Sequence, residues 1–142
     1  MSEDRHSVAV GRSGARELAM KLLFQMEAQN DYTDSIKNAF AKDNLQNKKQ
    51  KEYVEQICEL AKEHLSTVDG LIESTSENWK IERIGKIDLA VLRVAVLELM
   101  YMPDIPDSVA INEAVNVAKK YGTDDSGKFV NGILGKVVKN YK

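Results

Sequence analysis

The sequence lacks the features of secreted and membrane-spanning proteins. It has a single cysteine, so no intramolecular disulfide can form, which suits the reducing cytoplasm. No run of 18 apolar residues occurs and the N-terminus has no apolar signal core, so we expect no membrane span and no secretory signal. The formal net charge is only -2, which excludes a protein that coats nucleic acid by bulk positive charge.

Residues that break helices or form hairpins are also scarce. The 142 residues include two prolines and eight glycines, and no Asn-Gly or Asp-Gly pair separates two alternating stretches. Apolar residues instead repeat at intervals of three and four, which indicates helices. A hydrophobic content of 43% with 30% charged residues excludes wholesale disorder. We therefore predict an all-α fold of about seven helices in two small packed bundles.

The helical pattern has one clear internal break. Residues 1–12 show no periodicity, which predicts a flexible N-terminal tail. An N-terminal helical subdomain is expected over 13–76, and a polar stretch separates it from a C-terminal subdomain over 77–142. In the second subdomain, the segment from Ile84 to Met102 is apolar nearly all round. That pattern predicts a buried central helix.

Nothing in the residue pattern supports catalysis. A nucleophile–base pair needs a positioned histidine, and only His6 and His64 occur. Cys58 lies six positions from His64, which is not metal-ligand spacing, and no other cluster completes a metal site. No glycine-rich phosphate loop follows a strand. We therefore expect a protein that is not an enzyme and that holds neither a metal nor a cofactor.

Charge is divided unevenly along the chain. Residues 1–78 carry ten basic and fourteen acidic side chains, whereas residues 79–142 carry ten basic and eight acidic ones. Neither half is strongly basic. Any site for an anion must therefore be local.

The stretch 123–132 is the strongest candidate for such a site. A helix N-terminus presents free N–H groups and the positive end of the helix dipole. Gly127 permits close approach of another backbone, Lys128 adds a charge, and Phe129 offers a ring on which a base can stack. The alternative is that Ser126 only caps the helix and Phe129 packs on the core. The residues alone leave both interpretations open.

Charged residues elsewhere have simpler explanations. Arg12 and Arg16 lie four positions apart on one helix face and can contact phosphates, but from the residues alone a solvated basic edge is the simpler interpretation. Arg93 lies within the apolar central helix, where a buried charge needs a partner. We expect a structural pairing for Arg93, for example with Glu113 of the following helix.

Several longer motifs resemble one known family. They are RIGKIDLAVLR (83–93), DIPDSVAINEAVNVAKKYG (104–122) and KFVNGILGKV (128–137), and the first helix, ARELAMKLLFQME (15–27), agrees with them. Together they resemble the NusB family of bacterial transcription antitermination factors over residues 12–138. The resemblance implies an all-α adaptor without enzymatic activity.

The resemblance also implies partners and contact residues. Members of that family pair with NusE, a small-subunit ribosomal protein, and the pair binds the single-stranded boxA element of nascent RNA. It acts in the RNA polymerase antitermination complex, notably on ribosomal RNA operons. RNA contacts are implied for Arg12, Arg16, Asp125, Lys128 and Phe129. Glu82 and Asp88 would face NusE.

The sequence departs from the family pattern before its first helix. The segment reads GRSGAR, with Ser13 and Gly14 where further arginines often stand. If about four phosphate contacts form, a fourfold rise in salt weakens single-strand binding roughly fifty-fold. We therefore expect RNA binding at cellular salt to depend on the protein partner. The alternative is a helical protein–protein scaffold or homodimer with little RNA binding of its own.

Overall fold

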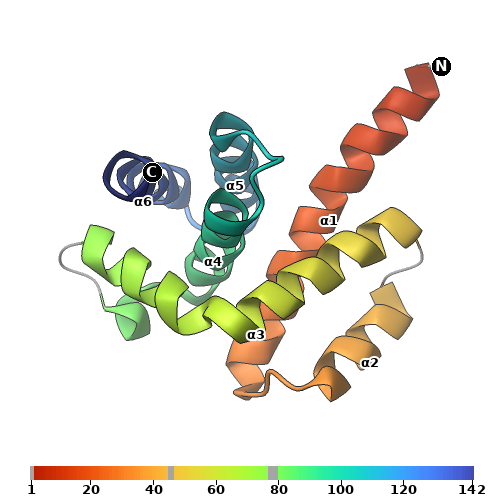
Figure 1. Ribbon diagram of the computed structural model, residues 1–142, viewed down its shortest axis with the longest axis horizontal. Helices are drawn as coiled ribbons and strands as arrows, with labels where there is room; N and C mark the ends of the chain where they lie inside the picture. Colours follow the sequence, from red (N-terminus) through yellow and green to blue (C-terminus); the bar gives the residue numbers. More distant parts are fainter. Residues whose placement is uncertain (1, 45–46, 77–79) are drawn as a thin grey trace. The chain divides into compact units, whose positions relative to one another are not determined.

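The computed structural model describes the backbone of residues 2–44, 47–76 and 80–142, and the side chains within these ranges from Ser13 onward. In these ranges the chain forms six α-helices, one short 3-10 helix and no strand (Figure 1). In chain order they are α1 (Ser2–Gln29), α2 (Asp34–Asn44), α3 (Lys48–Ser76), η1 (Ile81–Arg83), α4 (Lys86–Tyr101), α5 (Asp107–Tyr121) and α6 (Ser126–Tyr141). The predicted all-α class is confirmed.

The helices divide into two compact units, Met1–Glu59 and Leu60–Lys142. The division falls inside α3, whereas the sequence predicted a boundary between 76 and 77. The reason is that α3 is one continuous helix of 29 residues whose apolar stripe serves both units. Val54 is buried in the first unit and Val68 in the second.

The first helix also differs from its prediction. It begins at Ser2, so the segment 2–12 continues α1, where a flexible tail and a helix start at 13 were expected. Extending an existing helix adds one backbone hydrogen bond per residue and needs no new nucleus. A segment without an apolar stripe can therefore be helical, and periodicity alone does not detect it.

The N-terminal unit consists of α1, α2 and the first part of α3. Its buried side chains include Leu22, Leu23, Met26, Phe40, Val54 and Ile57. A Cβ on Gly14 of α1 would lie 3.0 Å from Nε2 of Gln50 in α3, so the end of the Gln50 side chain lies against α1 at this glycine. Asn47 caps α3, because its Oδ1 accepts hydrogen bonds from the backbone N–H groups of Lys49 and Gln50.

The turn between α1 and α2 is built by polar residues. Asn30 has a positive φ of 50°, and the next N–H, of Asp31, donates to the Met26 carbonyl at 2.9 Å. The Asp31 carboxylate accepts hydrogen bonds from the Thr33 hydroxyl, which has the larger effect, and from the Thr33 backbone N–H. These hydrogen bonds stabilise the ionised carboxylate and lower the pKa of Asp31. The left-handed backbone at Asn30 and these local hydrogen bonds therefore end α1.

Replacing Asn30 by valine should lower the free energy of unfolding by about 1–2 kcal/mol, because a β-branched side chain disfavours the left-handed backbone. Replacing it by glycine, which adopts this conformation freely, should leave stability unchanged or raise it. Urea unfolding of the two variants measures the difference. Equal stability of both variants would show that the backbone at residue 30 is not left-handed.

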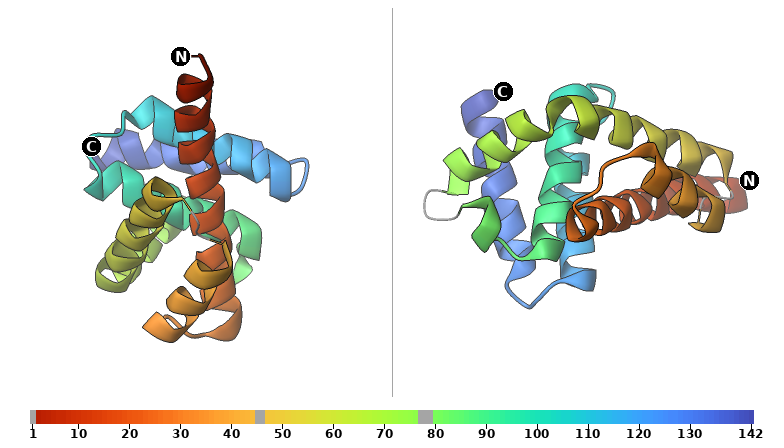
Figure 2. Two further views of the ribbon diagram at one scale, coloured as in Figure 1. Left: turned by 90° about the vertical axis from the view of Figure 1, so that its right-hand side faces the viewer. Right: turned by 90° about the horizontal axis from the view of Figure 1, so that it is seen from below.

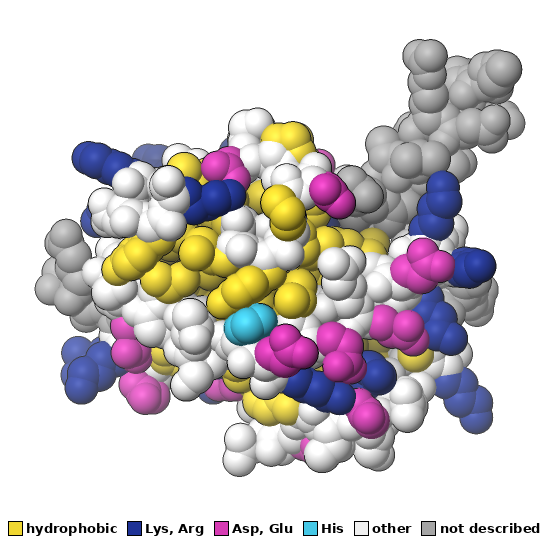
Figure 3. Space-filling model, viewed as in Figure 1, with side chains coloured by type: hydrophobic (Ala, Val, Ile, Leu, Met, Phe, Trp, Pro, Cys, Tyr) yellow, Lys and Arg dark blue, Asp and Glu magenta, His cyan; other side chains and the backbone are white. Residues whose placement is uncertain are grey.

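The C-terminal unit is built around α4. Every residue from Leu89 to Leu99 is buried, which confirms the predicted central helix. The three helices α4, α5 and α6 pack on one another, and both views of Figure 2 show them side by side. Hydrophobic side chains remain visible between α6 and the second part of α3 on the face shown in Figure 3. This unit carries most of the candidate site residues.

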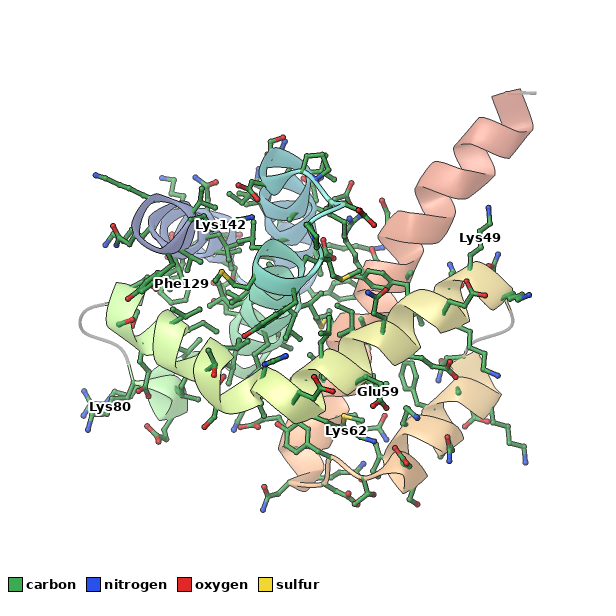
Figure 4. The ribbon with its side chains drawn as sticks, viewed as in Figure 1. Lys49, Glu59, Lys62, Lys80, Phe129 and Lys142 are labelled. Atoms are coloured by element: carbon green, nitrogen blue, oxygen red, sulfur yellow. The ribbon has the colours of Figure 1, made fainter. Side chains whose placement is uncertain are left out.

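Polar contacts join the helices of this unit to one another. The buried guanidinium of Arg93 in α4 donates to Asp69 of α3 from Nε at 2.9 Å and from Nη2 at 2.8 Å. Lys142 Nζ donates to the Leu99 carbonyl at 2.7 Å and to Asp107 Oδ1 at 2.6 Å, and Figure 4 shows it among α4, α5 and α6. The pairing of Arg93 is structural, as expected, and the partner shown is Asp69.

Candidate functional site

The start of α6 is fixed by a close approach to the end of α5. A Cβ on Gly122 would lie 2.3 Å from the Ser126 Oγ and 2.8 Å from the Ala118 carbonyl oxygen, so only glycine fits there. The Ser126 Oγ accepts a hydrogen bond from the backbone N–H of Thr123 at 2.9 Å. Asp125, at the N-cap position, makes no side-chain capping hydrogen bond. Ser126 thus braces the preceding loop and does not cap the helix.

The candidate residues of this turn have different exposures. Lys128 is exposed, Phe129 is half-buried and Asp125 is exposed. Phe129 is therefore neither fully exposed nor fully packed in the core, and base stacking on its ring stays a prediction. Figure 4 shows Phe129 at α6.

Gly127 has a different neighbour from the one expected. It is buried, and a Cβ there would lie 3.0 Å from Cγ and 3.1 Å from Cε of Lys119 in α5. The glycine admits the aliphatic stem of a lysine, whereas we expected another backbone. Long cationic side chains commonly lay their stems on apolar surface and keep the charged group in water. Lys119 is exposed overall and so adds a second cation beside the first turn of α6.

An open pocket of about 200 Å³ joins this turn to the start of α4. It is lined by Arg83, Ile84, Gly85, Asp88, Thr123, Asp125, Ser126 and Phe129. Among the described residues, the side chains of Arg83, Asp88 and Asp125 have no hydrogen-bond or ion-pair partner. The pocket thus presents one cation and two carboxylates beside an aromatic ring.

The two predicted RNA-binding arginines of α1 are placed differently from the expected surface pair. Arg16 is only 5% exposed, because the buried face of α1 is broader than its apolar stripe and includes Met20. The side chain of Arg12 lies outside the described residues. RNA contacts by either arginine stay predictions.

The two residues predicted to face a protein partner lie near the pocket. Glu82 is an exposed residue of η1, and Asp88 is a half-exposed residue in the first turn of α4. Acidic side chains at a helix start also interact favourably with the helix dipole. Of the two, Asp88 alone lines the pocket, together with Asp125 and Phe129.

Three surface residues were missed by the sequence reasoning. Arg83 joins the pocket from η1, and Lys119 reaches α6 from α5. Phe24 of α1 is a large aromatic side chain that is 36% exposed. In the sequence, the exposure of Phe24 is indicated by its position outside the apolar stripe of the first helix. Arg83 and Lys119 lie within the motifs 83–93 and 104–122, but nothing in these motifs singles them out from other surface cations.

Within the part of the chain that the structure describes, no group of three or more His, Cys, Asp or Glu side chains is placed to hold a metal ion. No helix in the same ranges combines the length and apolar character that crossing a membrane requires.

The fold and the site define an all-α protein with an open pocket, lined by polar and aromatic side chains, at the start of its last helix. Residues 13–139 match the NusB family, and the chain belongs to that family. It is 46% identical over 130 residues to the transcription antitermination protein NusB of Ruminiclostridium cellulolyticum, covering 92% of this chain and 90% of the relative.

Solved structures agree with this assignment. A structure of T. maritima NusB has 40% identity and a TM-score of 0.83, and 91% of each chain is covered. A crystal structure of antitermination factors NusB and NusE in complex with dsRNA contains a chain with 28% identity and a TM-score of 0.84. The match covers 92% of this chain and 98% of that chain.

Proposed function

We propose that the chain is a transcription antitermination adaptor that acts in the cytoplasm. It pairs with NusE and binds single-stranded boxA-type RNA in nascent ribosomal RNA transcripts, within the antitermination complex of RNA polymerase. Family membership supports the antitermination role. The related complex of NusB and NusE with dsRNA supports RNA and NusE as partner classes.

One observation carries the RNA part of the proposal. Asp125, Lys128 and Phe129 lie on the first turn of one helix, with Lys128 exposed and part of the Phe129 ring accessible. An accessible ring is a platform for an unstacked base, and a lysine beside it contacts the phosphate of the same strand. Lys119 adds charge to the same turn, and Arg12 is the proposed phosphate contact of α1.

The protein partner is assigned to the acidic edge beside this turn. Glu82 and Asp88 lie in η1 and in the first turn of α4, close in sequence and both accessible. An acidic edge attracts a basic ribosomal protein and orients its approach. A partner at this edge would extend the RNA-binding surface that starts at Phe129, so the pair would hold RNA at a salt concentration that the chain alone does not tolerate.

Replacing Phe129 by alanine should weaken binding of boxA-type RNA about tenfold, because one base loses its stacking platform. Phe129→Tyr keeps the ring and should bind as the unmodified chain does. Lys128→Ala should lower the slope of log affinity against log salt by about 0.7, whereas Lys139→Ala, at the far end of α6, should not change it. Fluorescence anisotropy with and without NusE measures these effects.

Two further measurements distinguish the proposed adaptor role from the alternatives. Scrambled single strands and duplex RNA test whether the strand and its sequence matter. Sedimentation of the chain alone tests the scaffold alternative. Unchanged affinity of a folded Phe129→Ala, Lys128→Ala double variant would reject the site. A stable homodimer that binds no RNA even with NusE would reject the adaptor role.

A further inference from the structure

The last helix, α6, has one face that is fully open to solvent. From residue 128 to residue 139 its exposed positions follow one another at steps of three, one, three, one and three, which places them on a single face over about three turns. The positions between them are buried or half-buried. This outer face of α6 consists of Lys128, Asn131, Gly132, Gly135, Lys136 and Lys139.

The outer face of α6 carries charge of one sign only. The helix has three lysines and no acidic side chain, although the net charge of the whole chain is -2. Lys119 and Lys120 add two cations in the last turn of α5, and Figure 3 shows Lys and Arg side chains gathered over α6 at the upper left. Among the described residues, no hydrogen bond or ion pair engages the ammonium groups of Lys128 and Lys139. Such a face attracts an anionic partner.

Two glycines lie in the middle of this charged face, where the fold does not require them. A Cβ on Gly132 or Gly135 would meet no heavy atom within 4 Å, and neither residue has a positive φ. Glycine inside a helix is less favourable than alanine, so both residues weaken α6. Glycine also lets a second backbone approach the helix closely. The cationic face is therefore flat at its centre, which suits another helix laid across it.

We propose that the outer face of α6 binds an acidic helix of a protein partner. The backbone of that helix lies over Gly132 and Gly135, and its carboxylates pair with Lys136 and Lys139. This partner differs from NusE, because a cationic face repels a basic ribosomal protein. The surface is also separate from the RNA contacts proposed above, which use the first turn of α6. It therefore does not depend on the proposed RNA binding.

A second copy of the chain and a nucleic acid are the competing occupants. In a symmetric dimer the outer face of α6 would meet itself, so that lysines oppose lysines. A single RNA strand stacks its bases on aromatic rings, and this face presents none. Duplex RNA is contacted through its phosphates, which need cations but no glycine within a helix. These features favour an acidic helix.

Gly132→Leu places a bulky side chain where the two helices would meet. The variant should fold normally, because the space above Gly132 is open and leucine favours a helix. Gly70→Leu is the matched control, since Gly70 is an exposed glycine within α3 whose Cβ would also meet no heavy atom within 4 Å. Lys139→Glu reverses one charge of the face, whereas Lys139→Arg keeps it. Circular dichroism and urea unfolding check the fold of each variant.

The probe is a stapled helical peptide with alanines along one face and glutamates on both sides of that face. Its control peptide has glutamine in place of each glutamate. Fluorescence anisotropy with the full chain measures affinity, and amide chemical shifts locate the contact, which should fall at 131–139. The unmodified chain, Gly70→Leu and Lys139→Arg should bind the acidic peptide alike. Gly132→Leu and Lys139→Glu should each weaken binding about tenfold. Gly132→Leu should leave the binding of boxA-type RNA with NusE unchanged.

Four results would overturn this assignment. They are no binding of the acidic peptide, equal binding of the glutamate and glutamine peptides, unchanged binding by Gly132→Leu, and amide shifts confined to other helices. Duplex RNA that binds the chain and loses affinity with Lys139→Glu, while the acidic peptide does not bind, would make the face a nucleic-acid surface. A dimer in sedimentation that Lys139→Glu dissociates would assign the face to a second copy. None of these results touches the proposed antitermination role, which is tested at Phe129 and Lys128.

Discussion

Replacing Asp69 by alanine should lower the free energy of unfolding by about 3–5 kcal/mol, because it leaves a buried guanidinium without its bidentate partner. The side chain of Arg93 is 4% exposed, and its Nε and Nη2 donate to the two carboxylate oxygens of Asp69 at 2.9 and 2.8 Å. The pair joins the second part of α3 to the central helix. Thermal and urea unfolding, followed by circular dichroism, measure the loss.

A surface pair provides the matched control. Lys37 and Asp34 lie 3.5 Å apart, and the Asp34 side chain is 61% exposed, so Asp34→Ala should cost less than about 1 kcal/mol. Replacing the pair together, as Asp69→Leu with Arg93→Met, should cost less than Asp69→Ala alone, since the guanidinium is then not left buried without Asp69. If Asp69→Ala and Asp34→Ala proved equally stable, the buried pair would not stabilise the fold.

Replacing Gly122 by alanine should have the second-largest effect, a loss of about 3 kcal/mol. The new Cβ would lie 2.3 Å from the Ser126 Oγ, 2.7 Å from the Ser126 Cβ and 2.8 Å from the Ala118 carbonyl oxygen. A change of the Ser126 rotamer relieves only the first contact, because the other two atoms are fixed by the backbone. The first turn of α6 must therefore shift, and RNA binding through Phe129 should weaken with it.

Gly132→Ala tests whether this cost is specific to the site. Gly132 lies in the exposed middle of α6, and a Cβ there would meet no heavy atom within 4 Å. Alanine should therefore stabilise the helix by about 0.5–1 kcal/mol through its higher helix propensity. Differential scanning calorimetry should show the two variants shifting Tm in opposite directions. A Gly122→Ala protein as stable as Gly132→Ala would mean that α5 and α6 do not meet as described.

Local sequence patterns predicted the elements of the C-terminal unit well. The apolar run from Ile84 to Met102 identified the buried helix, and Pro103 and Gly122 marked the ends of α4 and α5. These signals depend on neighbours three or four positions away. The start of α1 escaped prediction because a helix that propagates from an existing turn needs no apolar stripe.

The candidate site was predicted less completely. The sequence, through its family motifs, identified Asp125, Lys128 and Phe129, and the structure leaves each at least partly accessible. It also suggested an exposed position for Arg16, which the broader buried face of α1 overrides. Arg83 was missed because its contribution depends on η1 lying beside the start of α6.

By itself the sequence determined the helical class, the buried central helix and the family motifs, because each follows from spacing along the chain. Only the tertiary structure decided that Arg93 pairs with Asp69, 24 residues earlier, and that Ser126 braces the loop before it. It alone placed Arg83 and Phe129 around one pocket. The physical reason is that periodicity specifies which face of a helix is buried, whereas the partner of a polar side chain depends on which other element that face meets.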